Sequence, residues 1–246
     1  MRDNLLPMNE IEPASLLDEL ASTRPIFHSE ADFQHALAML IARQHPTARL
    51  RLETRPHRGV HLDIQIDADG GRSAIELKYL VRAFDGEHFD LPNRGAHDIS
   101  RYDVVKDIAR VELLVEEGFA QQGWVIVLAS DSAYWRSGSK LDSIDLAFRI
   151  HEGSRLTGER AWGQLAGAGT RRQRELALSL TDIPCCFVSS CDRLGVLGPG
   201  GVLAVLGAGL EAAVQNADET VGQLAQGGVV TDTAVAQLIV VGARTG

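Results

Sequence analysis

The sequence contains few lysines, few cysteines and no long apolar run. Lysine accounts for only three of its 24 basic residues, so arginine is the ordinary cation of this chain. The three cysteines lie within residues 185–191, and their odd number and spacing do not suggest a disulfide framework or a paired zinc site. Residues 1–7 lack the apolar centre of a signal peptide. We therefore expect a reducing, cytoplasmic location.

Two further absences limit the partners of the chain. The longest stretch without a charged residue, 194–210, is interrupted by proline and glycines and is too short to cross a bilayer, so no membrane contact is expected. An excess of basic charge is also lacking, since the net charge is −9 at pH 7. Any contact with nucleic acid must then come from a local basic patch. With 246 residues, the chain can form one well-packed domain, with or without an appended segment.

Two alternating stretches predict a β-hairpin over residues 60–80. Apolar side chains occupy every second position in 60–66 and again in 75–79, which is typical of half-buried strands. The segment between them contains Asp69, Gly70 and Gly71, which supply the positive φ angles of a tight turn.

The register of this hairpin decides whether three charged side chains share a face. A two-residue turn puts Asp63, Glu76 and Lys78 on one face: a turn at 69–70 places Asp63 opposite Glu76, and a turn at 70–71 places it opposite Lys78. A three-residue turn would send Asp63 to the other face. Neighbouring carboxylates repel each other, so we expect a cation between them. Mg²⁺ takes such oxygen ligands, and a lysine beside them can orient or deprotonate a water. The alternative is a solvated face with an ordinary Glu76–Lys78 pair.

These residues resemble the signature of the PD-(D/E)XK nuclease superfamily, and residues 102–135 also look like an uncharacterised bacterial branch of it. The signature reads Leu62-Asp63 and, after twelve residues, Glu76-Leu77-Lys78, with Leu62 in place of the proline. The resemblance implies a restriction-endonuclease-like α/β fold: an α-β-β-β-α-β core with a mixed central sheet flanked by helices. It also implies metal-dependent hydrolysis of nucleic acid, DNA in preference to RNA. Asp63 and Glu76 would hold Mg²⁺ (or Mn²⁺), and Lys78 would orient the water or stabilise developing charge.

A helix beginning after Ser29 precedes the first strand, 47–55. Ser29 is the expected N-cap, with Asp32 placed as in a capping box. The resemblance implies that this helix supplies another acid to the catalytic site, and Glu30 is the candidate. The alternative is an acid that suits the helix dipole.

Further elements follow the hairpin. The pattern predicts a helix over 98–117, a buried strand over 124–129 and strands over 144–150 and 175–180. Asp103, Asp107 and Arg110 share a polar face of the helix, which either lines the site or forms a salt-bridged surface; for Asp103 and Arg110 we expect the surface.

The predicted organisation has three parts. Residues 1–28 form an N-terminal helix or tether, and 29–183 form the nuclease-like domain. Residues 184–246 form a glycine-rich, charge-poor segment that we interpret as an appendage. On this interpretation a chain ending near residue 181 stays soluble. The alternative is that 202–206 or 234–241 completes the sheet, and the shortened chain is then insoluble.

Arginines outside the hairpin are the candidates for contact with nucleic acid. They occur around the first strand and in a second basic segment, at Arg51, Arg55, Arg58, Arg171, Arg172 and Arg174. The alternative is a solvent-exposed arginine surface that binds no nucleic acid. The rival to a nuclease is a non-catalytic module that kept the fold and binds nucleic acid or a protein partner, and a homodimer is compatible with either function.

Overall fold

The computed structural model describes residues 11–24, 27–85, 90–91, 96–134, 136–151, 154–184 and 238–244. Its centre is a mixed five-stranded sheet in the order β1-β2-β3-β6-β9. β1, β2 and β3 are antiparallel neighbours, β6 lies parallel to β3, and β9 is antiparallel to β6. The strands are β1 (Arg49–Thr54), β2 (Leu62–Ala68), β3 (Gly71–Leu80), β6 (Gln122–Ala129) and β9 (Leu238–Arg244).

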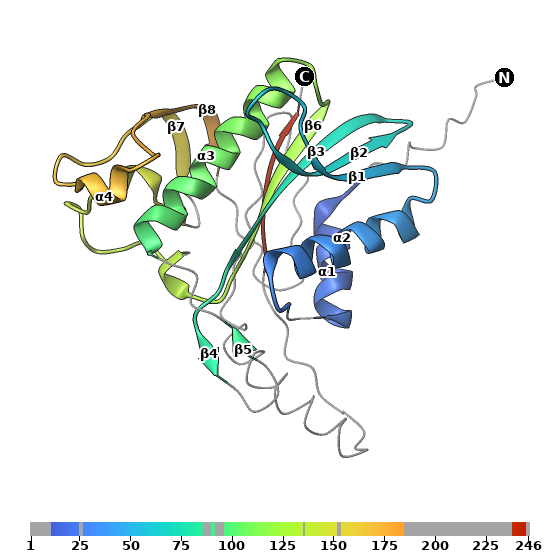
Figure 1. Cartoon of the computed structure of the whole chain (residues 1–246), viewed down its shortest axis with the longest axis horizontal. Helices are drawn as coiled ribbons and strands as arrows, with labels where there is room; N and C mark the ends of the chain where they lie inside the picture. Colours follow the sequence, from blue (N-terminus) through green and yellow to red (C-terminus); the bar gives the residue numbers. More distant parts are fainter. Residues whose placement is uncertain are drawn as a thin grey trace.

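Helices cover both faces of this sheet (Figure 1). α1 (Pro13–Thr23) and α2 (Glu30–Gln44) pack on one face, and α3 (His97–Glu116) packs on the other. As predicted, Ser29 caps α2 and accepts a hydrogen bond from the amide of Asp32 at 3.1 Å. None of the helices in the described residues has both the length and the apolar composition needed to cross a membrane.

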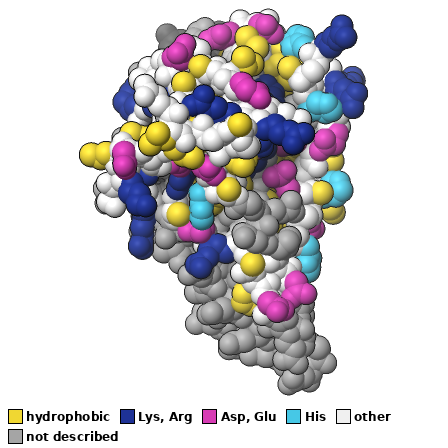
Figure 2. Space-filling view, turned by 60° about the vertical axis from the view of Figure 1, so that its left-hand side comes forward, with side chains coloured by type: hydrophobic (Ala, Val, Ile, Leu, Met, Phe, Trp, Pro, Cys, Tyr) yellow, Lys and Arg dark blue, Asp and Glu magenta, His cyan; other side chains and the backbone are white. Residues whose placement is uncertain are grey.

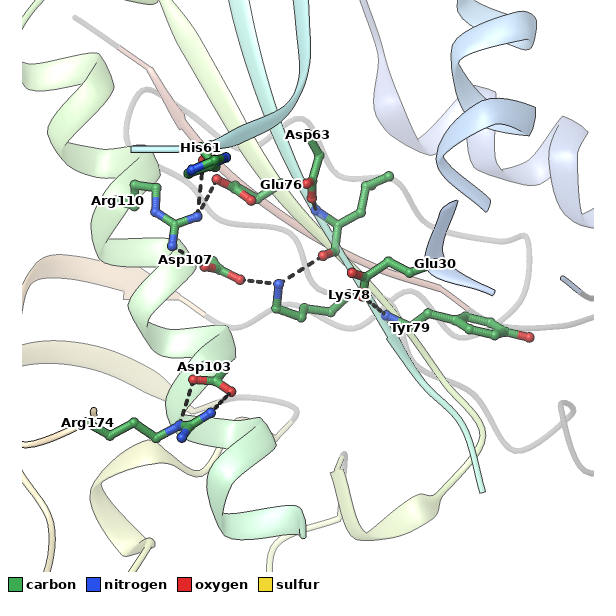
Figure 3. A network of polar contacts seen from close by, with 11 residues as sticks. Glu30, His61, Asp63, Glu76, Lys78, Tyr79, Asp103, Asp107, Arg110 and Arg174 are labelled. Atoms are coloured by element: carbon green, nitrogen blue, oxygen red, sulfur yellow. Dashed lines mark hydrogen bonds and ion pairs between the residues drawn. The ribbon is translucent and has the colours of Figure 1, made fainter. Parts of the chain in front are cut away.

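The alternation of β3 separates its apolar side chains from its charged ones. Ile75, Leu77 and Tyr79 belong to the core under α1 and α2. Glu76 and Lys78 point to the opposite face, where α3 lies (Figure 3). The predicted α/β class and the predicted hairpin are therefore confirmed.

A smaller lobe packs against α3. It contains η1 (Ser132–Tyr134), η2 (Leu146–Phe148), β7 (Arg155–Arg160), α4 (Ala168–Arg171) and β8 (Leu178–Pro184), with β7 and β8 paired. The short strands β4 (Phe84–Asp85) and β5 (Asp90–Leu91) pair separately.

The predicted strand over 144–150 is wrong, because this stretch contains the 3₁₀ turn η2. The side chain of Asp145 accepts hydrogen bonds from Ser143 and Arg101, and its carbonyl accepts the amide of Phe148. An aspartate that satisfies local donors in this way favours a turn over a strand.

Both ends of the described chain belong to the main core. Leu16, Leu17 and Leu20 of α1 are buried in the same cluster as α2 and the sheet, so 11–24 is no tether; residues 1–10 lie outside the described residues. At the other end, β9 pairs with β6 from Leu238 to Arg244. Part of the predicted segment 184–246 thus contributes a strand to the main sheet; residues 185–237 lie outside the described residues.

A chain that ends at residue 237 lacks β9 and leaves the backbone groups of β6 unpaired at one edge. Because β6 is buried and apolar, we expect a lower melting temperature and association through this edge. Thermal unfolding and light scattering measure both effects. A chain that ends at residue 244 keeps β9 and serves as the control; equal behaviour of the two chains would show that β9 adds nothing to stability.

Candidate active site

The candidate site lies where β2 and β3 separate. Ala68 pairs with Gly71, so the turn consists of Asp69 and Gly70, one of the two registers predicted, and the last backbone pair is Ile64 with Ile75. Continuing this register puts Asp63 opposite Glu76, as predicted for that turn.

Beyond that point, side-chain carboxylates replace the neighbouring strand as acceptors for β3. The amide of Leu77 donates to Oδ2 of Asp63 at 2.6 Å, and the amide of Tyr79 donates to Oε2 of Glu30 at 2.9 Å (Figure 3). Buried backbone amides require partners. Asp63 and Glu30 therefore provide acceptors for the amides of β3 beside Lys78, and the catalytic role of Glu30 stays a prediction.

A distortion in β1 accompanies the separation. Glu53 has a φ of 53°, in the left-handed region that non-glycine residues seldom adopt, and it lies between the pairs Leu52–Ile64 and Thr54–Leu62. Leu62 packs with Leu114 and other residues on the α3 side, whereas Ile64 and Ile66 belong to the core under α1 and α2. The alternation of 60–66 therefore does not keep Leu62 in one cluster with Ile64.

Gln34 of α2 holds this distorted region, and the sequence analysis missed it. Its amide nitrogen donates to the carbonyl oxygen of Asp63 and to Oε1 of Glu53, both at 2.8 Å, and the residue is only 5% exposed. A signal was present: Gln34 is a polar residue on the apolar face of its helix, four positions after Glu30, and so one turn along the same side.

α3 supplies two more charged residues, and these make a closed network with β3. Arg110 donates to Oε1 of Glu76 at 2.6 Å, and its other terminal nitrogen lies 3.0 Å from Oδ1 of Asp107. The ammonium of Lys78 lies 2.5 Å from Oδ2 of Asp107 and 3.1 Å from the carbonyl oxygen of Leu77. Figure 3 shows this network between the helix and the strand.

The network overturns two sequence expectations. The side chain of Glu76 is only 3% exposed and pairs with Arg110 rather than with Lys78, so the solvated Glu–Lys alternative is wrong. Arg110 belongs to the site and not to a salt-bridged surface. Asp103, by contrast, lies away from this network and pairs with Arg174.

Burial and the closeness of several carboxylates determine the pKa values of the acidic residues in this site. Burial raises the pKa of Asp63 to about 6, although the hydrogen bond from Leu77 and the charge of Lys78 oppose the shift. Burial, with Asp107 and Asp63 nearby, also raises the pKa of Glu76 well above its ordinary range. Excess negative charge therefore favours uptake of protons, or of another cation, between these carboxylates.

Lys78 responds in the opposite way. Burial alone would lower its pKa, but the negative charges of Asp107 and Glu30 outweigh burial, and the pKa is raised above the ordinary lysine value. The side chain is thus held as an ammonium. It can donate hydrogen bonds and stabilise negative charge, but it is not suited to remove a proton from water.

The site offers few groups to a metal ion. In the described part of the chain, no three His, Cys, Asp or Glu side chains are placed to hold one together. Asp63 and Glu76 each use one carboxylate oxygen in the contacts above, which leaves the other for a ligand.

The predicted nucleic-acid-binding arginines differ in how they are engaged. Arg174 pairs with Asp103, Arg51 lies 3.1 Å from Asp67, and Arg171 donates to the carbonyl oxygen of Gly163. Arg51, although paired with Asp67, is exposed, as are Arg55, Arg58 and Arg172. Basic and acidic side chains are interspersed on the face drawn in Figure 2 rather than forming one basic area.

No family model, curated protein or solved structure matches the chain. The resemblance stated for the sequence therefore rests on Asp63, Glu76 and Lys78 and stays a prediction.

The raised pKa of Asp63 has a consequence for stability without metal. Between about pH 4 and pH 6 the folded protein keeps a proton that the unfolded chain has released, so the free energy of unfolding falls as pH rises through this window. The Asp63→Asn variant keeps an acceptor for the Leu77 amide but loses the charge. We expect it to be more stable than wild type near neutral pH by on the order of 2 kcal/mol, with the difference vanishing below about pH 4. Urea unfolding at several pH values measures it; a pH-independent difference would contradict the assignment.

Replacement of Gln34 by methionine keeps the length of the side chain and removes its donor. The Asp63 carbonyl and the Glu53 carboxylate then lose a buried hydrogen bond, at a cost of roughly 1 to 3 kcal/mol in the free energy of unfolding. Chemical denaturation checks this value, with Gln122→Met as control because the half-buried Gln122 donates a single side-chain hydrogen bond among the described residues, to the hydroxyl of Ser73. Equal losses in the two variants would remove the special role of Gln34.

Proposed function

We propose that this chain is a metal-dependent nuclease that hydrolyses phosphodiester bonds, with DNA as the favoured substrate. The observation that carries the proposal is the meeting of Asp63, Glu76 and Lys78 where β2 and β3 separate, beside Glu30 of α2. The element order from α2 through β1, β2, β3 and α3 to β6 agrees with the α-β-β-β-α-β core of the PD-(D/E)XK superfamily and supports a restriction-endonuclease-like topology.

The charges of the site support a divalent cofactor. The carboxylates of Glu30, Asp63, Glu76 and Asp107 outnumber the cations Lys78 and Arg110 by two. Burial is the main cause of the raised pKa values of Asp63 and Glu76, and the neighbouring carboxylates raise them further. Mg²⁺ binds through one or two carboxylates together with water and substrate phosphate oxygens, so the residues present fit Mg²⁺ or Mn²⁺ without a third acidic ligand.

Asp63 and Glu76 would hold this ion, which supplies polarisation of the phosphate and activation of a water when it is bound. The chain's own residues do the rest. Gln34 and the Leu77 amide fix Asp63, and Arg110 fixes Glu76. Lys78, kept charged by Asp107, stabilises the negative charge that develops on the phosphate.

Binding of the substrate phosphates is assigned to exposed arginines close to where β2 begins. Arg55 and Arg58 lie in the segment between β1 and β2 that leads to Asp63, and neither side chain pairs with an acid among the described residues. Arg172 of the smaller lobe is a further exposed cation. Phosphate contacts of this kind supply affinity without sequence specificity.

A non-catalytic binding module is the second candidate, and one observation favours it. Glu76, Lys78, Asp107 and Arg110 already form complete ion pairs with one another, so the network can persist as a structural element. Such a module would bind nucleic acid or a protein partner without cleaving it.

The deciding experiment incubates the full chain with supercoiled plasmid and with single-stranded DNA, in Mg²⁺, Mn²⁺ or EDTA. Cleavage that requires the cation and is lost in Asp63→Ala and in Glu76→Ala supports the nuclease. Cleavage at the wild-type rate in both variants would refute the site. Retained DNA binding without cleavage by the wild type would support the non-catalytic module.

The Lys78→Arg variant keeps the charge and changes its shape. A planar guanidinium cannot replace a compact ammonium held between Asp107 and the Leu77 carbonyl, so we expect cleavage to slow by about a hundredfold, equivalent to roughly 2.7 kcal/mol of barrier. DNA binding should change little. Lys106→Arg is the control, because Lys106 is exposed on α3, next to Asp107 in the sequence; wild-type cleavage by Lys78→Arg would eliminate the catalytic role.

A further inference from the structure

Both carboxylate oxygens of Asp107 are occupied by cations of the chain itself. Oδ2 lies 2.5 Å from the ammonium of Lys78, and Oδ1 lies 3.0 Å from the guanidinium of Arg110. The same guanidinium lies 2.6 Å from Oε1 of Glu76. A single arginine therefore connects the buried acid of β3 with the buried acid of α3 (Figure 3).

This arrangement differs from a site built for two divalent ions. Such sites place the ions roughly 3.5 to 4 Å apart and need enough carboxylate oxygens to bind both. Here Asp107 is the acid of α3 that faces Glu76, and neither of its oxygens is available. Glu30 lies at the edge of β3 and uses one oxygen on the amide of Tyr79.

We propose that the site takes one divalent cation per chain and that Lys78 and Arg110, anchored by Asp107, occupy the place of a second. This deepens the proposed function and rests on its metal-dependent part. In a two-cation site the second ion neutralises charge on the leaving oxygen. An ammonium and a guanidinium at fixed positions supply that positive charge without a second ion.

Charge neutrality supports the same count. When all six side chains are ionised, the four carboxylates exceed the two cations by two charges, and one divalent ion balances them. A second ion would leave two excess positive charges among side chains that are mostly removed from water, and uncompensated buried charge is costly.

The test counts Mn²⁺ ions bound to the full chain, from the loss of the electron paramagnetic resonance signal of the free ion. We expect one equivalent for the wild type and none for Asp63→Ala. Arg110→Gln frees one oxygen of Glu76 and one of Asp107, so its count should rise to two, whereas Arg110→Lys retains the charge and should bind one.

The matched control is Arg174→Gln. Arg174 also pairs with an aspartate of α3, Asp103, and its side chain is 24% exposed, against 21% for Arg110. This variant should still bind one equivalent. Thermal unfolding of each variant confirms folding, and the wild-type count remains decisive if Arg110→Gln does not fold.

The outcomes separate the inference from the proposed function. Two equivalents in the wild type, both lost in Asp63→Ala, would overturn the inference and leave a metal-dependent nuclease intact. A count of one in folded Arg110→Gln would also overturn it, because Arg110 would not be what excludes the second ion. One equivalent in the wild type without cleavage of DNA or RNA would remove the proposed function, and no uptake by any variant would remove both.

Discussion

Separation of β2 from β3 at Asp63 is the constraint on which the rest of the site depends. Once the strands part, the amides of Leu77 and Tyr79 need acceptors, and carboxylates from β2 and α2 provide them. The same carboxylates are thereby brought to the side of Lys78. The same side chains therefore satisfy the backbone amides of β3 and bring negative charge together. Gln34 of α2 fixes Asp63 by a hydrogen bond to its carbonyl oxygen.

The concentration of carboxylates on β3 also explains the charged residues of α3. A buried carboxylate such as Glu76 is costly unless it is paired, and the helix supplies Arg110 for this purpose. Arg110 in turn is shared with Asp107, which also binds Lys78. The ion pairs therefore align α3 with β3 along two successive outward positions of the strand.

Local patterns predicted much of this arrangement. Alternation in 60–66 and 75–79, together with the turn at Asp69 and Gly70, predicted the hairpin and the opposition of Asp63 and Glu76, because a strand has a period of two. Gln34 and the role of Arg110 could not be predicted in this way, since a helical pattern shows which residues share a face but not what that face meets. The strand expected over 144–150 failed because Asp145 satisfies donors locally. The pairing of β9 was foreseen only as an alternative, a strand within 234–241, because its sequence follows a long glycine-rich stretch and its partner is distant.

The late position of β9 also orders events during synthesis. Roughly 110 residues separate the end of β6 from the start of β9. At about 5 to 20 residues per second, the ribosome needs on the order of 5 to 20 seconds to make them. During this interval the strands that carry the site can already have paired, while one edge of β6 remains open to other nascent chains or to a chaperone. The strands that carry the charged site can thus pair before β9 covers the edge of β6, and this edge stays open for as long as synthesis of β9 takes.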